Sequence, residues 1–189
     1  MSTHHDRNMI GLAAEYAVAA ELCRRGIYAQ LTLGHQKKTD LLVFSQAGLV
    51  ARVEVKAKLG GEWPNCKGIA GPRVFIVFVD YENRDPADQP DFYVLSVRDW
   101  RAVLERRVEE IRAKSPKRRI EITSENVAVF PDQIRAGGRP YEGMSIRPPD
   151  IERHRDRWGK VSKAIRAGSQ RAWNFLSGIG DRSFWKSRS

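Results

Sequence analysis

The chain has 189 residues, 41% of them apolar, and its 33 lysines and arginines outnumber its 23 aspartates and glutamates. A chain of this length hides roughly 70% of its unfolded surface on folding, so we expect one globular domain with an appendage and exclude wholesale disorder. There is no apolar run long enough for a membrane span, residues 1–8 are too polar for a signal peptide, and the two cysteines are too few for a disulfide framework, so we expect a cytoplasmic protein with no membrane partner.

The N-terminal half is predicted to form a helix followed by strands. Residues 8–25 are rich in alanine and leucine, with Asp6 or Asn8 available as the N-cap, and Gly26 ends the helix. Strand-like runs bounded by turn or charged residues follow. They begin at Ile27, Asp40, Leu49, Arg73 and Asp91.

A second helix is predicted over residues 97–113, because Ser96 and Asp99 have capping-box spacing and Ser115 is followed by a proline. A short edge strand is expected at Ile120. Residues 1–150 hold 23 basic and 20 acidic side chains, whereas residues 151–189 hold 10 and 3, so most of the net charge of +10 is C-terminal. We therefore expect an α/β domain over residues 1–147 and a basic, aromatic-containing helical extension over residues 148–189 that ends in a mobile tail.

The register of the hairpin between the second and third strands follows from its loop. Residues 46–48 suit a three-residue loop with Gly48 in the left-handed position, which pairs Ser45 with Leu49. Counting back along both strands places Asp40 opposite Glu54. Two opposed carboxylates destabilise a sheet unless a cation offsets them, and strand alternation puts Lys56 beside Glu54 on the same face.

Each of these acids also has an ordinary interpretation. The third strand could present a solvated face on which Lys56 and Arg52 neutralise the carboxylates. Glu15 lies on an apolar stripe of the first helix, so its carboxylate either has a cation or donor as partner or reaches the rim of the stripe. Glu21, by contrast, has the following arginines at ion-pair spacing.

Glu15 on an opening helix, Asp40 at the start of a strand, and Glu54 with Lys56 in the next strand resemble the catalytic pattern of the PD-(D/E)XK nuclease superfamily. The spacing is similar to that of small archaeal Holliday junction resolvases, and the likeness covers residues 11–97. Thr39 precedes Asp40 where the family name has proline, which bears on the subfamily. The resemblance implies a restriction-endonuclease-like core, with a central mixed sheet flanked by helices, and catalytic roles for these four residues.

The resemblance also implies a cofactor. Mg²⁺, with Mn²⁺ as a substitute, would be held by Asp40, Glu54 and the backbone carbonyl of Val55, and Glu15 would hold a second ion or orient a water. Lys56 would stabilise the attacking hydroxide and the charge developing on the phosphate.

The expected function is metal-dependent hydrolysis of phosphodiester bonds in DNA, with RNA as an alternative substrate of the same site. Symmetric cutting would need two active sites and hence a homodimer. The alternative class is a catalytically inactive nucleic-acid-binding or accessory module of the same fold, in DNA repair, mobile-element or defence systems.

Several residues near the predicted site are candidates for contact with nucleic acid. Trp63 lies in a glycine-rich loop that we expect over residues 60–71 and that could bring it to a phosphate strand. The alternative is that Trp63 packs on its own domain. Aromatic residues interleaved with basic ones beyond position 148 suit base stacking, or docking on a core. The candidate nucleic-acid contacts are Lys37, Lys38, Lys58, Trp63 and Lys67.

Overall fold

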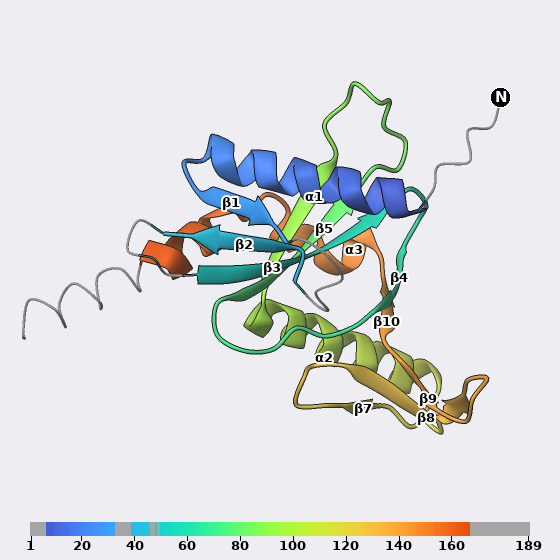
Figure 1. The fold of residues 1–189 in the computed structure, drawn as a ribbon. Coiled ribbons are helices and arrows are strands. Elements are labelled where there is room, and N and C mark those ends of the chain that lie inside the picture. The colour runs from blue at the N-terminus through green and yellow to red at the C-terminus, as the bar shows by residue number, and fades with distance from the viewer. Residues whose placement is uncertain (1–6, 33–38, 46–47, 49, 167–189) are drawn as a thin grey trace, which may run out of the picture.

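A computed structural model describes residues 7–32, 39–45, 48 and 50–166, and these form a mixed α/β architecture (Figure 1). The central sheet has five strands in the order β1-β2-β3-β5-β6. β3 and β5 run parallel and the other neighbours are antiparallel, which confirms the predicted mixed sheet. The strands are β1 (Tyr28–Leu31), β2 (Leu41–Phe44), β3 (Val50–Lys58), β5 (Val74–Asp80) and β6 (Asp91–Ser96).

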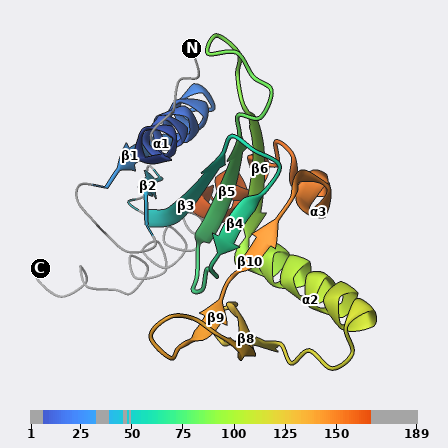
Figure 2. The same ribbon diagram turned by 90° about the vertical axis from the view of Figure 1, so that its right-hand side faces the viewer.

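Two long helices cover opposite faces of this sheet (Figure 2). α1 (Arg7–Arg24) ends where Gly26 takes a positive φ of 72°. α2 (Val97–Lys114) begins at Ser96, whose side chain forms the predicted capping box with Asp99. Both helices are confirmed, although Asp6 lies outside the described residues and Asn8 lies inside α1 rather than at its cap.

The helices create two apolar cores that share β5. Phe75, Val77 and Val79 belong to the core under α1, and the alternating residues of β5 belong to the core under α2. Every residue of β5 is buried. Parallel strands such as β3 and β5 are usually buried on both faces, and here α1 covers one face and α2 the other.

Among the described residues, five further strands lie outside the central sheet. One of them, β4, lies in the stretch that was expected to be a loop, whereas β7 confirms the edge strand expected at Ile120. The three-stranded sheet projects past α2, away from the central sheet (Figures 1 and 2). The strands are β4 (Trp63–Cys66) paired with β10 (Met144–Ile146), and β7 (Glu121–Ile122), β8 (Ala128–Ile134) and β9 (Pro140–Glu142) in the three-stranded sheet.

The C-terminal segment is built into both cores. α3 (Pro148–Ile151) and the 3₁₀ turn η1 (Glu152–His154) precede a helical stretch over residues 159–166. Ile151 packs in the core under α2, whereas Trp158 packs against Phe92 in the core under α1. The described part of the predicted extension thus contributes side chains to both cores, and the predicted mobile tail lies outside the described residues. Within the described ranges, no helix has the length and apolarity that crossing a bilayer requires.

A polar cluster around the buried His154 connects this segment to the start of α2. The Lys160 ammonium lies 2.8 Å from the Asp99 carboxylate and 2.9 Å from Nδ1 of His154. His154 is 5% exposed. Burial and the charge of Lys160 lower the pKa of His154 to about 4, so the folded protein keeps this imidazole neutral.

The free energy of unfolding is expected to fall by about 2 kcal/mol when the pH is lowered from about 7 to about 4.5. In the unfolded chain His154 takes up a proton near its ordinary pKa of about 6.5, whereas in the folded protein it does so only near pH 4. His154→Gln should remove most of this dependence. Urea unfolding of both proteins at the two pH values measures the effect, and an unchanged dependence in His154→Gln would contradict it.

Candidate active site

Asp40 is held from both sides by its backbone. The Thr32 N–H donates to the Asp40 carbonyl, and the Asp40 N–H donates to the Val53 carbonyl, each at 2.9 Å. β2 and β3 have the predicted register, with Leu42 paired to Arg52. In that register the next residues beyond the ladder are Asp40 and Glu54. The Asp40 Oδ2 atom accepts the Val55 N–H at 2.6 Å, so the side chain itself completes the ladder.

Glu54 is a buried carboxylate with one partner. Its side chain is 5% exposed, and Oε1 lies 2.7 Å from the Nζ atom of Lys56. Oε2 is buried and has no hydrogen-bond partner. An unpaired buried acceptor costs about 1–3 kcal/mol, and more when it is charged. The face is therefore not solvated at Glu54, where the core under α2 and β4 cover it, although Lys56 pairs with this carboxylate as the ordinary interpretation expected and Arg52 is exposed.

Glu15 belongs to the same electrostatic cluster. Burial and then Asp40 raise the pKa of Glu15, while Lys56 lowers it. Burial opposes the charge of Lys56, but Glu54 and then Asp40 raise the pKa of this ammonium above its ordinary value. Glu15 of α1, Asp40 just before β2 and Glu54 of β3 thus each lie within electrostatic range of Lys56.

The donor set at this site suits Mg²⁺. Asp40 keeps one carboxylate oxygen beyond the one bonded to Val55, and Glu54 offers the unpartnered Oε2. Mg²⁺ prefers oxygen ligands, keeps several waters and usually takes one or two protein carboxylates. Because of these two free oxygens, Asp40 and Glu54 are the residues that would hold Mg²⁺. In residues 7–32, 39–45, 48 and 50–166, no three or more His, Cys, Asp or Glu side chains are grouped as metal ligands.

Cys66 on β4 borders the site as a neutral group. Burial raises the pKa of its thiol to about 12, against the opposing effect of the nearby Lys56. Because the thiolate is the form of cysteine that attacks or binds metals, Cys66 acts here as an apolar wall of the site.

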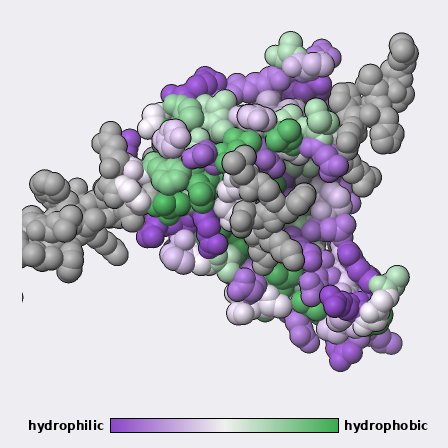
Figure 3. Space-filling view, in the orientation of Figure 1, coloured by the Kyte–Doolittle hydropathy of each residue, from purple (hydrophilic) through white to green (hydrophobic). Residues whose placement is uncertain are grey.

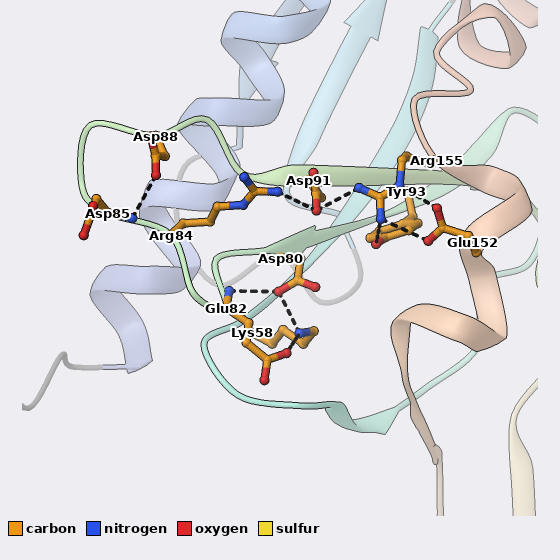
Figure 4. Close-up of polar contacts among 10 residues, drawn as sticks. All are labelled: Lys58, Asp80, Glu82, Arg84, Asp85, Asp88, Asp91, Tyr93, Glu152 and Arg155. Carbon is orange, nitrogen blue, oxygen red and sulfur yellow. Dashed lines mark hydrogen bonds and ion pairs between the residues drawn. The ribbon is translucent and has the colours of Figure 1, made fainter.

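Lys58 and Trp63, both predicted to contact nucleic acid, pack inside the domain instead. The Lys58 side chain is 1% exposed, and its ammonium lies 2.6 Å from Asp80 and 2.7 Å from Glu82 (Figure 4). It also lies 4.9 Å from the ring centre of Trp63, which is 1% exposed. The parallel register of β3 and β5 places Lys58 beside Asp80, and β4 places the Trp63 ring against the Lys58 ammonium. This correction leaves Lys67, which is 54% exposed and 3.5 Å from Glu142.

Two further sequence expectations can be placed. Glu21 is buried and pairs with Arg24 at 2.5 Å and with Arg25, as predicted. Lys37 and Lys38 lie outside the described residues.

No protein-family model and no curated protein matches this chain. Among solved structures, the chain is similar to a bacterial homing endonuclease, I-Ssp6803I, with a TM-score of 0.37 and 21% identity over 49% of this chain and 70% of the endonuclease chain. At this TM-score the likeness assigns neither a fold family nor an activity, so the residues of the site carry the proposal.

Mg²⁺ is expected to raise the melting temperature of the wild-type protein, because an ion that binds only the folded state stabilises it by mass action. Each kcal/mol should appear as a shift of about 2–4 °C in a protein of this size. Glu54→Gln and Asp40→Asn should lose most of the shift. Asp85→Asn, which alters an exposed loop carboxylate, is the control, and equal shifts in all four proteins would contradict the site.

Proposed function

We propose that the protein is a Mg²⁺-dependent nuclease that hydrolyses phosphodiester bonds in DNA. The observation that carries the proposal is the Glu54 carboxylate, which is buried with one oxygen on Lys56 and the other without a partner. Asp40 and Glu15 are negative charges in the same cluster. Such a site gains stability from a cation. When bound, Mg²⁺ would supply the positive charge that relieves the repulsion between an attacking hydroxide and a phosphate.

Lys56 would act on the phosphate. Its raised pKa keeps it an ammonium at neutral pH, and its side chain is 34% exposed, so it can reach a substrate. In the proposed reaction it donates to a non-bridging phosphate oxygen and stabilises the charge that develops there.

Glu15 would act on the water. A raised pKa makes this carboxylate a stronger base than a free glutamate, and partial burial still leaves it accessible. In the proposed reaction it orients the attacking water and accepts its proton as the new bond to phosphorus forms. The bond to the leaving oxygen breaks at the same time, and that oxygen takes a proton from solvent. The Val55 carbonyl would complete the protein ligands beside Asp40 and Glu54.

Plasmid DNA is expected to be cut with Mg²⁺ or Mn²⁺ and left intact in EDTA. Asp40→Ala and Lys56→Ala should each lower the cleavage rate by at least about 100-fold, the usual loss when one charge-stabilising group is removed. Asp85→Ala and Lys114→Ala remove exposed residues of the same types and should retain activity, and circular dichroism confirms that each variant folds. Equal cutting in EDTA would refute the proposal.

One observation favours a second candidate, a nucleic-acid-binding module without turnover. Lys56 already pairs with Glu54, so the protein itself neutralises part of the site's charge. Retention of DNA in a gel shift, with no metal-dependent cutting of plasmid, single-stranded DNA, branched DNA or RNA, would favour this module. Sedimentation with and without DNA tests the predicted homodimer.

A further inference from the structure

The hairpin formed by β8 and β9 ends in an apolar pair bordered by two arginines. Ile134 pairs with Pro140, and the loop beyond them is closed by a hydrogen bond from the Arg135 N–H to the Arg139 carbonyl at 2.9 Å. Gly137 and Gly138 make the turn with positive φ angles of 100° and 75°. Ile134 is 61% exposed. In the space-filling view, the region where Figure 1 places β8 and β9 is largely hydrophilic (Figure 3).

The hairpin is fixed to β4 rather than hanging free. The Arg135 guanidinium lies 4.5 Å from the ring centre of Tyr141 and donates to Asn65 Oδ1 at 2.9 Å. The Tyr141 hydroxyl donates to the same oxygen at 2.6 Å. At the base, Gly143 allows close approach, because a Cβ there would lie 3.0 Å from the Asn65 backbone.

β4 also borders the candidate active site. Asn65 precedes Cys66, whose thiol lies within electrostatic reach of Lys56 and Glu54, and Cys66 pairs with Met144. Arg139 is five residues before Met144, so the backbones of these two residues are at most about 17 Å apart at ~3.3 Å per residue. Along a DNA duplex, that distance equals the rise of about five base pairs at ~3.4 Å each.

We infer that the hairpin is an arm that binds the minor groove of duplex DNA, with Ile134 and Pro140 inserted between base pairs and Arg139 on a phosphate. Apolar wedges of this kind unstack and kink DNA. The two arginines beside the exposed isoleucine favour a polyanionic partner over an apolar protein surface. The inference rests on the proposed function, because it takes the substrate of that site to be double-stranded DNA.

Binding is measured by fluorescence anisotropy with the full chain and a duplex of about 30 base pairs in EDTA, and bending is measured by energy transfer between dyes at the two duplex ends. Ile134→Ser should weaken binding about tenfold and abolish bending. Ile134→Thr, which keeps a β-branched residue in the strand, should do the same if the serine variant fails to fold. Met9→Ser is the matched control, since Met9 on α1 is 62% exposed.

The arginine has its own signature. Arg139→Ala should reduce the slope of log affinity against log salt concentration by about 1, the contribution of one phosphate contact. Arg98→Ala, which removes an exposed arginine from α2, should leave this slope unchanged. Equal binding and bending by the isoleucine variants and Met9→Ser would overturn the arm, as would an equal loss of affinity for single-stranded DNA. Because these measurements need no turnover, a bending protein that never cuts would refute the nuclease alone, and a cutting protein that bends DNA without Ile134 would refute the arm alone.

Discussion

The hydrogen bond from the Val55 N–H to the Asp40 carboxylate is the contact on which the candidate site depends. It lies just before β2 begins at Leu41, so the side chain takes the place of the backbone acceptor that the ladder would otherwise need. Because one oxygen is committed to β3, the carboxylate stays beside Glu54. A slip of one residue in this register would turn Glu54 and Lys56 to the opposite face of the sheet, away from the core under α2.

The two lysines on this face of β3 differ because their partners differ. Lys58 is enclosed by two carboxylates and an aromatic ring, and its charge is fully matched inside the protein. Lys56 pairs with only one oxygen, that of the buried Glu54 carboxylate, and remains partly exposed. A matched and buried charge stabilises the fold, whereas a partly exposed charge beside an unpartnered oxygen is available to a ligand. This contrast separates a structural lysine from a candidate functional one two residues away.

The sequence could predict what short-range geometry determines. The hairpin loop fixed the pairing of β2 with β3, and local capping signals located α2. The burial of Lys58 in ion pairs could not be predicted in this way. Its partners Asp80 and Glu82 lie at and just after the end of β5, and no tight turn specifies the register of this parallel strand with β3. β4 was missed because its four residues include a proline, which ordinarily argues against a strand. The burial of Trp63 follows from that missed strand.

β4 connects the parts of the molecule that local sequence patterns treat separately. Trp63 donates a hydrogen bond to the Val79 carbonyl and packs over Lys58, which fixes one end of β4 on the central sheet. Asn65 holds the hairpin of β8 and β9, and Cys66 lies against the candidate site. Lys58, with its partners Asp80 and Glu82, therefore affects the site indirectly. Its contact with Trp63 positions β4, and β4 positions the hairpin relative to Glu54 and Lys56.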